Sequence, residues 1–179
     1  MVYLFLAEGF EEIEALATVD ILRRAEIGVE TVSITDSNKV LGAHKIEVTA
    51  DKLFNEISAD AEMYILPGGM PGTLNLGAFK PLCDLLKKVN SEGRFIAAIC
   101  AAASVFGELG LLKGKKATCY PGFEEKLSGA EVLTEPVVVS GNVITSRGAG
   151  TAHLFGFKLT ELLKNSEIAE NLKKGMLYE

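Results

Sequence analysis

The amino-acid sequence predicts an α/β fold in which a mostly parallel sheet lies between two layers of helices. Short apolar runs rich in β-forming residues alternate with helical patterns along all 179 residues, as in repeated βα units. No Pro/Ser-rich linker and no internal repeat interrupts the alternation. The composition, 48% hydrophobic and 23% charged, is typical of a globular domain. We therefore expect one domain that spans residues 1–179.

The first part of the chain contains short apolar runs and one long amphipathic pattern. In order, these predict a strand at residues 2–6, a helix at 11–25, a strand at 29–33, a hairpin at 39–50 and a strand at 63–66. Each strand is an apolar run too short for a helix. The hairpin alternates weakly after the turn residues Asp36-Ser37-Asn38. Pro67-Gly68-Gly69 closes the last of these strands.

The second part of the chain repeats this alternation. It predicts a helix near residues 79–89, a strand at 95–99, a helix at 101–109, short strands at 132–134, 137–139 and 143–146, and helices at 152–163 and 167–174. Strands joined by crossover helices run parallel and are covered on both faces. Ligands in such sheets bind at the carboxyl ends of the strands, so candidate site residues are sought in the loops that follow them.

Composition and charge exclude several classes of protein. The net charge of −6 and the pI near 5.1 argue against nucleic acid or an anionic membrane as the main partner. The longest apolar run, residues 95–106, is shorter than the ~20 residues of a membrane helix. The first eight residues contain no basic leader, so we expect a cytoplasmic protein.

The cysteines and histidines do not indicate a metal site or a disulfide framework. Three cysteines without a close pair, and two histidines, favour neither. The segment from Arg147 to Thr151 resembles the start of a dinucleotide loop, but His153 occupies the third glycine position. A GxxxxGK[ST] phosphate loop is also missing from the sequence. We therefore expect neither a metal nor a cofactor.

Cys100 lies between a buried strand and residues that favour a helix. A cysteine at such a sharp strand-to-helix turn matches a nucleophile elbow, and Ala98 and Ala102 are small enough for the turn to be tight. The N-terminus of the following helix is expected to lower the thiol pKa. The alternative is an inert structural cysteine, because free cysteines are often buried.

Two backbone N–H groups are candidate donors to an oxygen that becomes negative during attack on a carbonyl. One belongs to Ala101, the first residue of the expected helix, and the other to Gly69 in the loop after residues 63–66. An ordinary glycine turn is the alternative interpretation of that loop.

Glu14 is the candidate acid/base residue. On a helical wheel it borders the apolar stripe that contains Phe10, Ala17 and Ile21, whereas Glu12 points away. A carboxyl group against apolar surface has a raised pKa and is suited to share a proton with a thiol. The alternative is a helix-start charge that interacts with the helix dipole.

Four segments resemble the ThiJ/PfpI superfamily, and within it the bacterial-type members of the DJ-one branch. They are residues 6–14 (LAEGFEEIE), 66–69 (LPGG), 97–101 (AAICA) and 145–151 (TSRGAGT). The resemblance extends over essentially the whole chain, with the motifs in the same order. It implies a flavodoxin-like three-layer sandwich that forms a homodimer and carries an oxidation-sensitive cysteine at the elbow.

The resemblance also implies roles for particular residues. Cys100 would be the nucleophile, Glu14 the carboxyl group bonded to its sulfur, and Gly69 and Ala101 the backbone donors. Arg24 and His44 match positions where the branch often has basic residues near the dimer contact and the site. Tyr120 stands in the loop where some relatives carry histidine, which would leave proton transfer to Glu14, a water or the phenol.

Three functions follow. The first, which the resemblance implies, is a cysteine-dependent enzyme of glutathione-independent glyoxalase or deglycase type, acting on small aldehydes or on glycated amines and thiols. The second is a redox-sensing protective protein or chaperone, whose Cys100 oxidises to the sulfinate without significant turnover. The third is a dimeric scaffold in which Cys100 is structural. The elbow favours the first two over the third.

Overall fold

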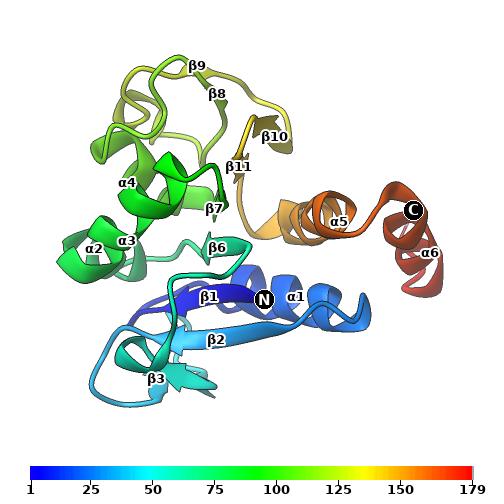
Figure 1. Ribbon diagram of the computed structural model, residues 1–179, viewed down its shortest axis with the longest axis horizontal. Coiled ribbons are helices and arrows are strands. Elements are labelled where there is room, and N and C mark those ends of the chain that lie inside the picture. The colour runs from blue at the N-terminus through cyan, green and yellow to red at the C-terminus, as the bar shows by residue number, and fades with distance from the viewer. Residues whose placement is uncertain (179) are drawn as a thin grey trace.

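The computed structural model describes residues 1–178. Its central sheet has seven strands and lies between layers of helices (Figure 1). The strand order is β10-β11-β7-β6-β1-β2-β5. Its strands are β1 (Val2–Leu6), β2 (Val29–Ser33), β5 (Lys52–Leu53), β6 (Met63–Leu66), β7 (Phe95–Ile99), β10 (Val137–Ser140) and β11 (Val143–Ser146). All neighbours are parallel except β10, which pairs antiparallel with β11 at one edge. The predicted α/β class and mostly parallel sheet are confirmed.

Two small sheets accompany the central one. β3 (Lys39–Leu41) and β4 (Glu47–Thr49) form an antiparallel hairpin, which confirms the hairpin expected between residues 39 and 50. β8 (Lys116–Ala117) pairs parallel with β9 (Glu131–Val132). The strand expected at 132–134 is thus shifted toward the N-terminus. The two-residue strands β5 and β8 were not predicted, because they are too short to show a period.

Helices cover both faces of the sheet. They are α1 (Glu12–Arg24), α2 (Gly72–Ala78), α3 (Lys80–Ser91), α4 (Ala103–Glu108), α5 (Ala152–Leu163) and α6 (Ser166–Gly175). Short 3-10 turns occur at η1 (Phe54–Glu56), η2 (Cys100–Ala102), η3 (Glu124–Lys126) and η4 (Ala149–Thr151). Helix α2 was not predicted, because glycines near both of its ends give the segment weak helix propensity. The helix expected from residue 101 begins at 103, after the η2 turn.

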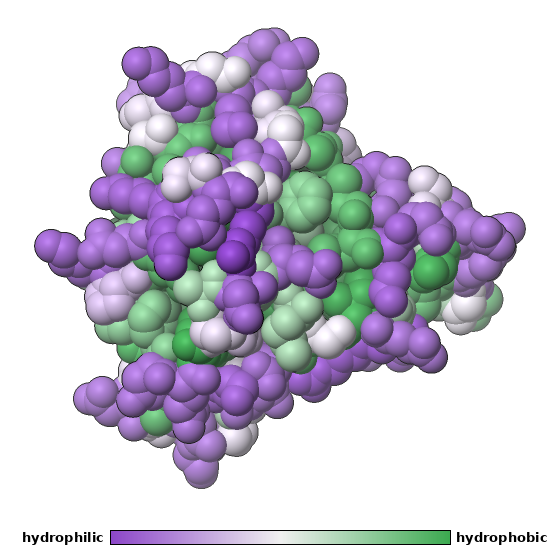
Figure 2. All heavy atoms as spheres, in the orientation of Figure 1, coloured by the Kyte–Doolittle hydropathy of each residue, from purple (hydrophilic) through white to green (hydrophobic). Residues whose placement is uncertain are grey.

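The side chains of the central strands alternate between two hydrophobic cores. In β1, Tyr3 and Phe5 pack with α2, α3 and α4, whereas Val2, Leu4 and Leu6 pack with α1 and α5. This alternation follows from the period of two in a strand, and it explains why these runs are continuously apolar. On the face shown in Figure 2, hydrophobic residues gather around α5 while hydrophilic residues cover the periphery. Every helix in residues 1–178 is too short or too polar to cross a bilayer.

Candidate active site

The carboxyl ends of three adjacent parallel strands meet at one edge of the sheet. Strands β1, β6 and β7 are neighbours. The loop after β1 leads to Glu14 in the first turn of α1, the loop after β6 contains Gly68 and Gly69, and β7 ends directly before Cys100. The chain leaves β1 for β2 on one side and reaches β6 on the other, so this edge is a topological switch point, where such sheets bind ligands.

Cys100 adopts the backbone conformation of a nucleophile elbow. Its φ is +64°, in the left-handed region that costs a residue with a Cβ about 1 kcal/mol or more. The residue follows Ile99 at the end of β7 and opens η2, and its carbonyl oxygen accepts a hydrogen bond from the N–H of Tyr120 at 3.3 Å. A strained turn that holds a cysteine at the sheet edge is typical of a catalytic position.

Glu14 faces the cysteine across Gly68. The Glu14 side chain is 1% exposed, and its Oε2 accepts the N–H of Gly68 at 2.7 Å. A Cβ added to Gly68 would lie 2.6 Å from Cys100 Cβ and 2.7 Å from Glu14 Oε2. Only glycine therefore allows the thiol and the carboxyl group to adjoin at this point.

Burial raises the pKa of both groups. Desolvation raises the pKa of Glu14 to about 7, against the lowering effect of hydrogen bonds with Gly68 and Cys100. Desolvation, and then the charge of Glu14, raise the pKa of the Cys100 thiol to about 12. The expectation of a lowered thiol pKa is therefore wrong in its net direction, because burial and the charge of Glu14 outweigh the backbone donors. Cys100 is only partly exposed and lies beside a carboxylate. It opens the 3-10 turn η2, which leads into the short helix α4.

Two backbone donors are directed at the sulfur. Against the effect of burial, hydrogen bonds from the backbone of Ala101 and Gly69 lower the thiol pKa. Gly69 has a φ of +91°, a conformation that glycine adopts without strain. An oxygen that becomes negative next to the sulfur would meet these two N–H groups.

A cavity of about 490 Å³ opens onto the sulfur. Six of the seven residues singled out from the sequence line it: Glu14, His44, Gly69, Cys100, Ala101 and Tyr120. A Cβ added to Gly148 would lie 3.2 Å from Tyr120 Cδ2 and 3.9 Å from Cys100 Sγ, so the phenol ring and the sulfur both adjoin Gly148. The cavity is also lined by Glu11 and Ile13, which belong to the segment 6–14 but were not singled out, and by Met70 and Phe123, which lie outside the quoted motifs.

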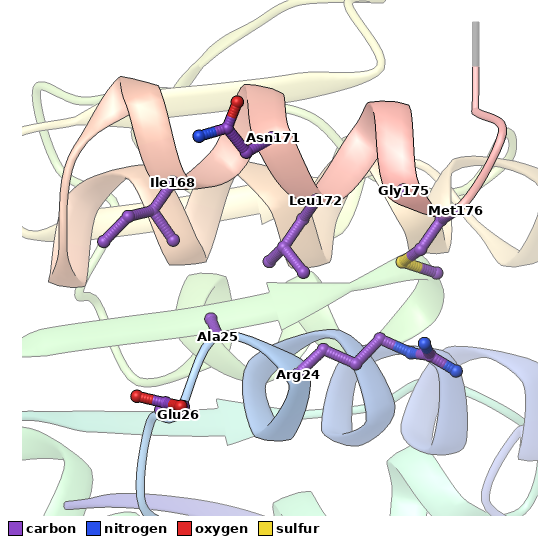
Figure 3. Close-up of a pocket in the computed structure, with 8 residues that line it drawn as sticks. All are labelled: Arg24, Ala25, Glu26, Ile168, Asn171, Leu172, Gly175 and Met176. Carbon is purple, nitrogen blue, oxygen red and sulfur yellow. The ribbon is translucent and has the colours of Figure 1, made fainter.

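Arg24 is the residue that the structure does not bring to this cavity. It lies ten residues after Glu14 on α1, about 15 Å along the helix axis, and forms an ion pair with Asp20 at 2.7 Å. Figure 3 shows Arg24 beside α6, facing a separate groove with Leu172 and Met176. Within this chain, Arg24 therefore has no contact with the Cys100 site.

Glu12, which the helical wheel placed away from the apolar stripe, is nevertheless buried in the structure. It is 4% exposed because the turn between β3 and β4 covers it. Its Oε1 accepts the backbone N–H of His44 at 2.7 Å, and its Oε2 lies 2.8 Å from Nδ1 of the same histidine. The helical wheel missed this burial because it considers one helix without the segment that packs on it.

The fold is a mostly parallel α/β sandwich, and its site combines a strained cysteine turn, a buried carboxyl partner and two convergent backbone donors. These features define a class of cysteine-centred α/β proteins. Residues 1–162 match the model of the DJ-1/PfpI family, and the chain belongs to this family.

Known members resemble the chain over nearly its full length. Protein DJ-1 homolog B of Arabidopsis thaliana is 42% identical over 92% of this chain, and the match covers 38% of that protein. The glutathione-independent glyoxalase DJ-1 of Schizosaccharomyces pombe is 34% identical over 93% of this chain and 92% of that protein. The structure of oxidized Toxoplasma gondii DJ-1 superposes with a TM-score of 0.95 at 36% identity, over 99% and 97% of the two chains. The chain spans about two fifths of the length of its two Arabidopsis relatives.

Proposed function

We propose that this protein is a cysteine-dependent enzyme that converts small reactive carbonyl compounds, in the manner of a glutathione-independent glyoxalase. The observation that carries this proposal is the Cys100 thiol facing the buried Glu14 carboxyl group, with the N–H groups of Gly69 and Ala101 directed at the same point. The glyoxalase name of the Schizosaccharomyces pombe relative supports it. No cofactor is required for the chemistry below.

The raised pKa values suggest how the thiol attacks. A thiol with a pKa of about 12 is protonated at neutral pH, so its proton must leave as the S–C bond forms. Glu14, with a pKa of about 7, is partly ionised at neutral pH and is suited to take that proton and pass it to the aldehyde oxygen. The product of this step is a hemithioacetal, and the two N–H groups would stabilise the charge that develops on its oxygen.

The remaining steps need the same groups. With methylglyoxal, Glu14 would remove the proton on the carbon bonded to sulfur and return it to the neighbouring carbon, through an enediol. The resulting thioester would be hydrolysed by water, which releases lactate and restores the thiol. The sum is methylglyoxal plus water giving lactate, with no oxidant or reductant. The apolar side chains of Ile13, Met70 and Phe123 would suit the methyl group of such a substrate.

The alternative is a redox-sensing protective protein or chaperone that uses the same cysteine without turnover. Cys100 is the one partly exposed cysteine, since Cys83 and Cys119 are buried, and this favours oxidation at Cys100. Peroxide reacts with thiolates, however, and burial and Glu14 raise the pKa of this thiol. We therefore place carbonyl chemistry first, and we expect a cytoplasmic homodimer, as for the class of enzyme proposed.

Lactate formation from methylglyoxal without glutathione tests the proposal. The comparison includes wild type, Cys100→Ser, Glu14→Gln and the matched control Cys83→Ser, which alters a buried cysteine outside the cavity. We expect Cys100→Ser to abolish turnover, Glu14→Gln to reduce it about 10²-fold or more, and Cys83→Ser to behave as wild type. Full activity in Cys100→Ser would refute the proposal. Inactive wild type whose Cys100 is oxidised by peroxide before the other cysteines would favour the redox alternative.

A further inference from the structure

Glu12 and His44 form a carboxylate–imidazole pair at the same cavity, apart from the thiol and its carboxyl partner. Glu12 is buried and contacts the histidine twice. Its Oε1 accepts the backbone N–H of His44, and its Oε2 is hydrogen-bonded to ring Nδ1. Gly42 makes room for this carboxylate, because a Cβ there would overlap the Glu12 side chain. The turn between β3 and β4 is thus fixed to the start of α1 through Glu12.

The geometry decides which ring nitrogen is available. Since Nδ1 lies 2.8 Å from Glu12 Oε2, the neutral ring carries its proton on Nδ1 and leaves Nε2 as the free acceptor. The protonated ring offers Nε2–H as a donor. The side chain is 67% exposed and lines the cavity that contains Cys100. A carboxylate that orients an imidazole in this way is the arrangement used for general acid–base catalysis.

The charges around the ring favour its protonated form. The hydrogen bond with Glu12 and then the charge of Glu11, whose Oε2 is 3.5 Å from Nδ1, raise the pKa of His44. Both carboxylates belong to the start of α1. Glu14, Cys100 and Tyr120 line the same cavity as His44.

We propose that His44, positioned by Glu12, is a second proton-transfer residue and that it serves the carbonyl oxygen farther from Cys100. This inference rests on the proposed function and specifies its substrate class as vicinal dicarbonyls, in which both adjacent oxygens change protonation. While Glu14 removes the proton from the carbon bonded to sulfur, His44 Nε2–H donates a proton to the second oxygen and gives a neutral enediol. Glu14 then protonates the second carbon as the first oxygen returns a proton to His44, which yields the thioester and restores both residues.

Kinetics of His44 variants test this role. His44→Ala removes the imidazole, and His44→Gln keeps a donor for Glu12 but cannot exchange protons. We expect both variants to lower kcat for methylglyoxal about 10²-fold or more. Protection of Cys100 from iodoacetamide by methylglyoxal, which reports only the addition step, should be unchanged. The matched control is His153→Ala, because His153 stacks on Tyr178 outside the cavity.

Two further measurements separate proton transfer from a structural role. Added imidazole should restore turnover of His44→Ala in proportion to its concentration. Glu12→Gln should move the basic limb of the kcat profile to lower pH, because the Glu12 carboxylate raises the pKa of His44. Wild-type kcat in the His44 variants, or no rescue by imidazole, would overturn this inference while leaving the proposed function intact. An inactive wild type would overturn both.

Discussion

Replacing Glu14 with glutamine should change how the stability of the protein depends on pH. The variant keeps the size of the side chain and an oxygen that accepts the N–H of Gly68, but it cannot ionise. The wild-type carboxyl group has a pKa of about 7 in the folded protein, raised from 4.5 mainly by burial. Between these two values the folded protein binds a proton that the unfolded chain has lost.

The sign and the size of the effect follow from this difference. Because the folded state binds more protons, wild-type stability falls as pH rises from 4.5 through 7. The full difference corresponds to about 3 kcal/mol, and most of it is lost between pH 5 and pH 8. Glu14 is 1% exposed, so solvent screening does not reduce this figure. The raised pKa of the Cys100 thiol affects stability only at pH values above this window.

Urea unfolding at pH 5 and pH 8 measures the effect. We expect the free energy of unfolding of Glu14→Gln, relative to wild type, to increase by about 2–3 kcal/mol from pH 5 to pH 8. Using this difference removes the contributions of other groups, such as the Glu12–His44 pair, which both proteins share. Glu125→Gln, at an exposed position in η3, is the matched control and should show no change. Parallel loss of stability in wild type and Glu14→Gln would refute the reasoning that Glu14 is desolvated beside Cys100.

One further substitution, at Gly68, and one chemical modification, of Cys100, probe the same site. Gly68→Ala should destabilise the protein by about 1–3 kcal/mol and abolish methylglyoxal turnover, because its Cβ would lie 2.6 Å from Cys100 Cβ. Gly150→Ala, with open space around it, is the control, and equal urea midpoints for the two variants would contradict this packing. Alkylation of Cys100 by iodoacetamide should be slow at neutral pH and accelerate up to at least pH 10, because burial and Glu14 raise its thiol pKa. Glu14→Gln should increase the neutral rate, and a wild-type rate that levels off below pH 7 would show that the thiol is already ionised there.

The sheet and the elbow could be predicted because their signals are local. The bounds of β1, β2, β6, β7 and β11 agree with the expected strands, since each is a short apolar run between turn residues. The elbow at Cys100 was recognisable from a buried strand that runs directly into small, helix-favouring residues. Strands β5 and β8 and helix α2 were missed, because pairing and packing rather than propensity stabilise them.

The site was only partly predictable. The helical wheel identified Glu14 as bordering the apolar face and placed Glu12 away from it, whereas the structure buries both. The sequence neighbours of Cys100 suggested a lowered thiol pKa, and the structure shows the opposite direction. In each case the error came from considering one element without the segments that pack against it.

The sequence by itself therefore determined the α/β class, the mostly parallel sheet and the position of the cysteine turn, because these depend on residues a few positions apart. The tertiary structure alone decided which groups surround that cysteine and how strongly they hold their protons. Glu14 meets the N–H of Gly68 across 54 positions of sequence, and Glu12 meets His44 across 32. Burial, charge and hydrogen bonding set the pKa values of the site, and all three arise only when these distant segments come together.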